Sequence, residues 1–137
     1  MSQESYQDLL FWQKGMDVAE LCYLKTKSFP KEELFGMTSQ IRRAAVSIPA
    51  NIAEGWGRGT TGEYIQFLRY AQGSLKELET HILLAQRVKL MTREDAAPIM
   101  EILSQISRLL ISTRHSLEQR SLWSKGVREE PEDHELP

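Results

Sequence analysis

The sequence contains a single cysteine, Cys22, and only three histidines in 137 residues. One cysteine cannot form an internal disulfide, and so few ligands cannot build a zinc site, which makes the reducing cytoplasm the expected compartment. Long hydrophobic runs are also missing. The longest aliphatic stretch covers residues 82–85, and the N-terminal residues 2–5 are polar and include an acid. A membrane span needs about 18 apolar residues, so neither membrane insertion nor secretion is expected.

The composition is that of one soluble globular domain, with 41% hydrophobic and 26% charged residues. The net charge of −2 is unevenly divided. Residues 126–137 hold five acids and one base, whereas residues 40–93 hold eight bases and four acids. This local excess is well below the charge of a dedicated DNA-binding domain. We predict a folded domain over residues 1–120 and an acidic, disordered tail over 121–137 that either aids solubility or competes with nucleic acid for the basic body.

Apolar residues recur at spacings of three and four, which is the helical period. The first predicted helix covers residues 8–27 and ends before Pro30, because the residue that precedes a proline avoids the helical conformation. Its predicted buried stripe is Leu9, Trp12, Met16, Ala19 and Tyr23. The second stripe is Met37, Ile41, Ala44, Ile48 and Ile52. We expect this second helix to be kinked but not broken at Pro49, and to end in the glycine-rich residues 55–59.

Two longer helices follow. Thr60 and Glu63 have the spacing of a capping box, and Thr92 with Asp95 marks another helix start, with Pro98 early enough to be tolerated. The third predicted stripe is Tyr64, Phe67, Ala71, Leu75, Leu78, Ile82 and Ala85. The fourth is Ala96, Ile99, Leu103, Ile106, Leu110, Thr113 and Leu117. Four helices, short connections and no strand pattern predict an all-α fold, an antiparallel up-down-up-down four-helix bundle.

Two of the helices carry more apolar residues than one stripe requires. The additional positions are Ile102, Leu109 and Ile111 in the fourth helix and Phe11, Val18 and Leu21 in the first. Exposed apolar strips of this extent are usually covered by a second subunit, so we expect a homo-oligomer. The alternative is burial of a wide helix face within a single bundle.

The motifs that suggest enzymatic chemistry lack their structural context. Residues 57–62 match G-x-G-x-x-G, but no strand precedes them, and a P-loop would need a lysine where Glu63 stands. With Arg58, the amides of this connection have the chemistry to hold one anion. The Glu-x-x-His pairs of di-iron bundles and the context of a nucleophilic serine are both missing. We therefore expect no enzyme, no cofactor and no metal site.

Polar residues lie where a simple bundle does not need them. Ser47, Asn51 and Glu54 share one helix face with Arg43. One interpretation is a hydrogen-bonded network that pairs the second and third helices, with Gly73 and Ser74 allowing close approach. Its predicted members are Ser47, Asn51, Glu54, Ser74, Glu77 and Thr80. The other interpretation is phosphate binding in a nucleic-acid site, for which the candidates are Arg42, Arg43, Arg58, Arg69 and Arg87.

Several of these segments resemble the bacterial four-helix-bundle family of 23S rRNA intervening-sequence proteins. The resemblance runs from about Tyr6 to Leu117 and is most specific in the blocks SIPANIAEG at residues 47–55 and GSLKELET at residues 73–80. Shorter matching segments are residues 29–30, 33–38 and 40–44. His81 replaces an expected glutamine-like residue, and the acidic tail lies outside the family pattern.

The resemblance implies a ring-shaped homopentamer with no known catalysis. The family is similar to the accessory proteins of diversity-generating retroelements, which bind nucleic acid and a reverse transcriptase through a basic surface. Three hypotheses follow: an oligomeric protein that binds RNA or DNA, a scaffold for a protein partner such as a reverse transcriptase, and a small enzyme. We favour the first, with salt-sensitive binding as its test.

Overall fold

The computed structural model describes residues 5–124, and every regular element within them is helical. Four long helices make up most of the chain: α1 (Leu10–Thr26), α2 (Ser39–Arg58), α3 (Thr61–Arg87) and α4 (Arg93–Ser124). Three short elements precede α1 and α2: the 3-10 turns η1 (Tyr6–Asp8) and η2 (Lys31–Glu33), and the π-helical turn η3 (Leu34–Thr38). The predicted all-α class with four helices is confirmed for this part of the chain.

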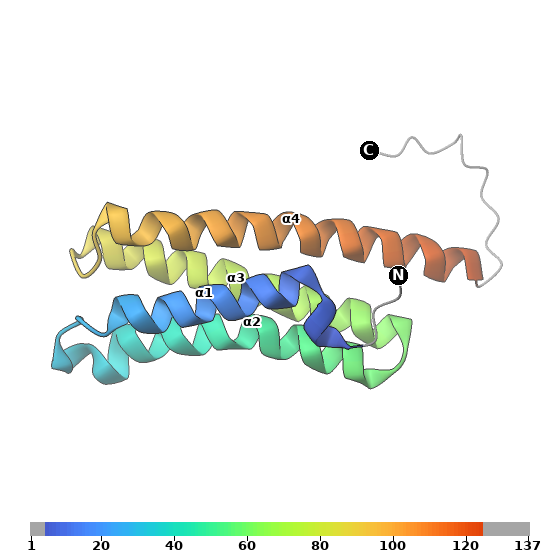
Figure 1. The fold of residues 1–137 in the computed structure, drawn as a ribbon, viewed down its shortest axis with the longest axis horizontal. Coiled ribbons are helices and arrows are strands. Elements are labelled where there is room, and N and C mark those ends of the chain that lie inside the picture. Colours follow the sequence, from blue (N-terminus) through green and yellow to red (C-terminus); the bar gives the residue numbers. More distant parts are fainter. Residues whose placement is uncertain (1–4, 125–137) are drawn as a thin grey trace.

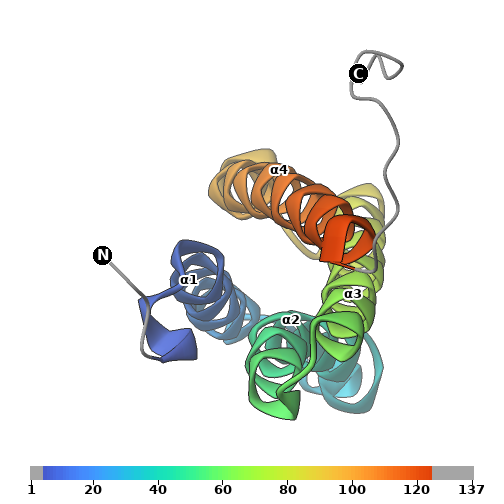
Figure 2. The ribbon, with the colours of Figure 1, turned by 90° about the vertical axis from the view of Figure 1, so that its right-hand side faces the viewer.

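The four helices lie side by side around one core, with α1 next to α2 and α4, and α3 next to α2 and α4 (Figure 2). The α1–α2 and α3–α4 connections lie at one end of the molecule, and the α2–α3 connection lies at the other (Figure 1). The most extensive contact is between α2 and α3. The core is almost entirely apolar, and its largest fully buried side chains include Ile48, Leu75 and Leu103.

The face of α1 that packs on the core agrees only in part with the predicted one, because Leu9 and Ala19 are buried and Trp12 packs against the core, as predicted. Met16 and Tyr23, predicted to be buried, are about half exposed, whereas Phe11 and Val18, predicted to be surplus, are buried. α1 carries apolar residues on several faces, so spacing alone does not select one of them. In the other predicted surplus strip, Ile102 and Leu109 pack against the core and Ile111 is 49% exposed. The second and fourth predicted stripes are buried except for the partly buried Met37 and Thr113.

Helix α2 runs without a break through Pro49 and ends at Arg58, within the glycine-rich residues 55–59 where its end was predicted. The residue that follows it, Gly59, caps this end, and its φ of +90° lies in the left-handed region that favours glycine. Pro49 is buried against Gly15 of α1, where an added Cβ would lie 3.3 Å from the proline ring. A Cβ on Gly55 would lie 2.7 Å from the Phe67 Cβ on α3. The residues of the SIPANIAEG block therefore set the approach of α2 to both neighbours.

Helix α3 begins at the predicted cap. The backbone N–H of Glu63 donates to Thr60 Oγ1 at 3.2 Å, and the Thr60 hydroxyl donates to Glu63 Oε1 at 3.0 Å. The buried stripe begins with Ile65 and Leu68 and not, as predicted, with Tyr64 and Phe67, which are partly buried. The prediction that Gly73 allows close approach is wrong, because a Cβ placed there would have no neighbour within 4 Å.

Helix α4 extends past the predicted domain boundary at residue 120 and ends at Ser124. Its start has the predicted cap, in which the Asp95 N–H donates to Thr92 Oγ1 at 3.0 Å. Pro98 lies inside the helix, in its second turn. The rest of the predicted acidic tail, residues 125–137, lies outside the described residues.

Candidate functional site

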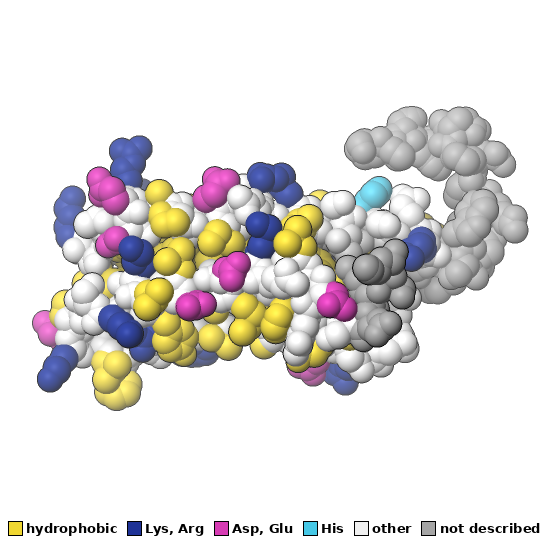
Figure 3. Space-filling model, viewed as in Figure 1, with side chains coloured by type: hydrophobic (Ala, Val, Ile, Leu, Met, Phe, Trp, Pro, Cys, Tyr) yellow, Lys and Arg dark blue, Asp and Glu magenta, His cyan; other side chains and the backbone are white. Residues whose placement is uncertain are grey.

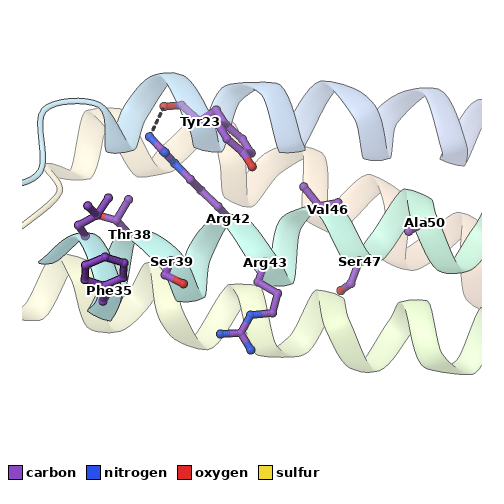
Figure 4. Close-up of a pocket in the computed structure, with 10 residues that line it drawn as sticks. Tyr23, Phe35, Thr38, Ser39, Arg42, Arg43, Val46, Ser47 and Ala50 are labelled. Carbon is purple, nitrogen blue, oxygen red and sulfur yellow. Dashed lines mark hydrogen bonds between the residues drawn. The ribbon is translucent and has the colours of Figure 1, made fainter.

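A groove runs between α1 and the start of α2, with a cavity volume of about 660 Å³. We call it the α1–α2 groove. Tyr23 contributes its α1 wall, and η3 and α2 contribute the remainder (Figure 4). Its lining residues are Tyr23, Leu34, Phe35, Thr38, Ser39, Arg42, Arg43, Val46, Ser47 and Ala50.

The π-helical turn η3 presents two large apolar side chains to solvent at one end of this groove. The Glu33 carboxylate accepts a hydrogen bond from the Met37 N–H at 3.1 Å, and Gly36 has non-helical angles of φ −109° and ψ −112°. The turn therefore does not continue the regular face of α2. Phe35 is 91% exposed and Leu34 is 50% exposed.

Apolar exposure continues along the groove. Tyr23 and Val46 are each a little less than half exposed, and Ala50 is exposed. Hydrophobic side chains gather over α1 and α2 on the face that Figure 3 shows. A contiguous apolar patch on a protein surface usually marks an interaction site. The sequence prediction missed this patch. Its signal was the pair Leu34-Phe35, placed between charged residues and a glycine in a connection.

Arg42 forms part of the fold as well as of the groove. Its Nε donates to Thr26 Oγ1 at 2.9 Å, and its guanidinium lies 4.5 Å from the centroid of the Tyr23 ring (Figure 4). Thr26 is buried, and its hydroxyl donates to the carbonyl of Cys22 at 2.8 Å. Arg42 thus ties α2 to the carboxyl end of α1, where a cation is favourable.

The predicted phosphate-binding arginines do not form one cluster. Arg58 lies 3.8 Å from the Glu54 carboxylate and 4.0 Å from that of Glu63, and Arg69 binds Glu118 at 2.9 Å. Arg43 and Arg87 are exposed, and neither has a hydrogen bond or ion pair to another described residue. In Figure 4 Arg43 points away from α1, on the side of α2 opposite Arg42. Of the five predicted arginines, Arg42 and Arg43 line the groove. Arg42 has hydrogen-bond partners on α1, whereas Arg43 has no hydrogen bond or ion pair to a described residue.

The hydrogen bonds of the predicted polar network run along single helices. Ser47 donates to the Ala44 carbonyl at 2.9 Å, and Asn51 Nδ2 donates to the Ser47 carbonyl at 2.8 Å. The remaining partners are also on the same helix, namely Glu54 with Arg58, Glu77 with His81, and Thr80 with the Lys76 carbonyl. In the part of the chain that the structure describes, these residues, Ser74 included, form no hydrogen bond between α2 and α3.

The remaining motifs carry no site of their own in residues 5–124. The G-x-G-x-x-G match spans the end of α2 and the start of α3, so a helix precedes it and not a strand. Burial raises the pKa of the Cys22 thiol to about 12, which disfavours the reactive thiolate. The described residues contain no group of three His, Cys, Asp or Glu side chains placed to hold a metal ion, and none of their helices is long and apolar enough to span a membrane.

Comparison with known proteins supports the sequence resemblance. The family model of the 23S rRNA-intervening sequence protein matches residues 7–112. A crystal structure of a protein with unknown function from the S23 ribosomal protein family of Bacteroides thetaiotaomicron has a similar fold, with a TM-score of 0.69 and 28% sequence identity. The similarity covers 77% of this chain and 98% of that one. No curated protein matches. The chain thus belongs to the family of 23S rRNA-intervening sequence proteins.

Proposed function

We propose that this chain is a non-enzymatic, oligomeric binding protein, an antiparallel up-down-up-down bundle that assembles as a ring-shaped homopentamer through the α1–α2 groove. The observation that carries the proposal is the exposure of Phe35, which is 91% exposed beside a concave apolar surface. Burying a phenylalanine or leucine side chain contributes about 1.5–3 kcal/mol. Covering Phe35 and Leu34 therefore favours association strongly.

The composition of the groove supports a protein interface. Aromatic residues and arginine are enriched among the residues that dominate binding energy, and here Tyr23, Phe35 and Arg42 line one groove, whereas the Arg43 side chain points away from α1. In a ring each subunit uses two different surfaces, so the groove of one subunit would face another surface of the next. The same features fit the scaffold hypothesis, in which a protein partner such as a reverse transcriptase binds the assembly.

The test is the molar mass of the full chain in solution, measured by sedimentation velocity. The substitution Phe35→Ser removes an exposed ring and leaves the core intact, so the expected result is a loss of the oligomer with unchanged helicity. Leu122→Ser, at a residue that is 52% exposed near the end of α4, is the matched control. A Phe35→Ser variant with the mass of the natural chain would refute assembly through the groove.

Nucleic-acid binding is the second candidate function. It is supported by the exposed Arg43 and Arg87, which have no described partner, and by the basic excess between residues 40 and 93. The excess of positive charge in one chain is small, but a ring of subunits presents each unpaired arginine several times. Several such contacts to one nucleic acid raise the overall affinity without any new contact within a subunit.

The corresponding experiment measures binding of a structured RNA and a matched DNA duplex across salt concentrations. Phosphate recognition predicts a negative slope of log affinity against log salt, reduced in the double variant Arg43→Gln/Arg87→Gln. Arg108→Gln is the control, because Arg108 is also exposed but donates to Ser104 on its own helix. Binding that is independent of salt and of these arginines would favour the protein scaffold.

A further inference from the structure

A second pocket lies near the end of the bundle that holds the α2–α3 connection, and its volume is about 290 Å³. All four helices and the residue before α1 contribute to it. Its lining residues are Leu9, Leu10, Phe11, Trp56, Tyr64, Leu109, Thr113, Leu117 and Arg120. Neither the groove nor the predicted arginine set shares a residue with this pocket. It is called the end pocket below.

The walls of the end pocket are apolar and partly aromatic. Trp56 and Tyr64 pack edge to face, with ring centroids 6.0 Å apart and an interplanar angle of 89°. Phe11 is buried, as is Leu117. An engineered apolar cavity of about 150 Å³ is large enough to bind benzene, so the end pocket has room for one aromatic ring with a short substituent.

Three of the lining residues carry polar groups, namely the hydroxyls of Tyr64 and Thr113 and the guanidinium of Arg120. None of them has a hydrogen bond or ion pair to a described residue. Thr113 and Arg120 lie seven residues apart on α4, and Leu117 lies between them at helical spacing, so the three share a face. Burial raises the pKa of Tyr64 to about 12, so its hydroxyl stays protonated near neutral pH and is able to donate.

An apolar pocket with a few convergent polar groups is the usual form of a small-molecule site. We propose that the end pocket binds a small aromatic monocarboxylate. The ring occupies the space against Trp56 and Phe11, and the carboxylate pairs with Arg120. Arginine is suited to this partner, because its planar fork of donors matches the two carboxylate oxygens. The proposal requires neither the assembly through the groove nor nucleic-acid binding.

The test follows the indole N–H signal of Trp56 in a ¹H–¹⁵N spectrum of the ¹⁵N-labelled full chain during titration with benzoate. The variant Trp56→Phe assigns the signal among the three tryptophans of the chain. The expected result is a saturable shift with a Kd on the order of 1 mM, in keeping with the few atoms of the probe. Benzyl alcohol, which has the ring but no charge, is expected to bind about tenfold more weakly.

Arg120→Gln is expected to raise the Kd for benzoate about tenfold and to leave the rest of the spectrum unchanged, because Arg120 makes no described contact that the fold needs. Arg108→Gln, on the same helix but outside the pocket, should have no effect. Equal affinity of the natural chain and Arg120→Gln for benzoate would overturn carboxylate recognition. A titration without saturable shift would overturn the site.

Discussion

Replacing Gly55 by alanine is expected to destabilise the protein although alanine is the better helix former. A Cβ at this position would lie 2.7 Å from the Phe67 Cβ and 3.2 Å from Tyr64 Cδ1. The Phe67 Cβ is joined directly to the backbone of α3, so no side-chain rotation relieves the first contact. Relief requires α2 and α3 to move apart, and these two helices form the most extensive contact of the bundle.

The magnitude follows from two opposed terms. Alanine in place of glycine inside a helix stabilises by about 1 kcal/mol, whereas overpacking a tight site costs about 1–3 kcal/mol. Gly57 provides the matched control, because it lies two residues away in α2 and an added Cβ would have no neighbour within 4 Å. The Gly55→Ala variant is therefore expected to be about 2 kcal/mol less stable than Gly57→Ala.

The assay is equilibrium unfolding in urea at one fixed protein concentration, since association contributes to stability. With a slope of about 2 kcal/mol per molar urea, the two variants should differ by about 1 M in midpoint. Equal midpoints for the two alanine variants would refute the argument that Gly55 sets the spacing of α2 and α3.

Three further predictions concern Thr26, Cys22 and the acidic segment. Thr26→Val removes the hydroxyl that accepts from Arg42 Nε and donates to the Cys22 carbonyl, so it should lower the free energy of unfolding by about 1–3 kcal/mol in urea titrations. The control is Thr80→Val, at an exposed residue, which should leave the free energy of unfolding unchanged. Burial raises the pKa of Cys22 from 9.0 to about 12, so the unfolded chain loses this proton first as pH rises, and stability should fall by about 1.4 kcal/mol per pH unit from about pH 9. Tyr64, whose pKa burial raises from 10.0 to about 12, steepens the fall above about pH 10, so a Cys22→Ala variant that keeps the full slope between about pH 9 and 10 would contradict this origin. The last prediction applies if the chain binds nucleic acid and the acidic segment competes for the basic residues. Changing the acids of residues 129–135 to amides in the full chain should then tighten RNA binding about tenfold at low salt and leave it unchanged at high salt. An equal effect at low and high salt would exclude electrostatic competition.

The helix positions could be predicted from the sequence because the stripes of α2, α3 and α4 are long and nearly unambiguous. Leu75, Leu78 and Ile82 repeat at helical spacing and are fully buried. The assignment failed in α1, where apolar residues surround the helix. In α1, close packing determines which face is buried, because only the face that carries the buried Gly15 leaves room for Pro49 of α2.

The candidate surfaces were less predictable, because each depends on residues that are far apart in the sequence. The exposure of Phe35 follows from the π-helical turn η3, whose Gly36 departs from helical angles. The end pocket joins Phe11, Trp56 and Arg120, which share no spacing pattern. The charge pattern predicted a shared phosphate site that the structure does not show, because the sequence does not reveal that Arg58 and Arg69 have acidic partners.

Assembly through the α1–α2 groove is the central proposal, and sedimentation velocity of the natural chain beside Phe35→Ser tests it most directly. We expect a natural chain with the mass of a pentamer, a Phe35→Ser variant near the 15.8 kDa of one chain, and a Leu122→Ser control that behaves as the natural protein does. A natural chain that sediments as a monomer, or a Phe35→Ser variant that keeps the full assembly, would contradict it.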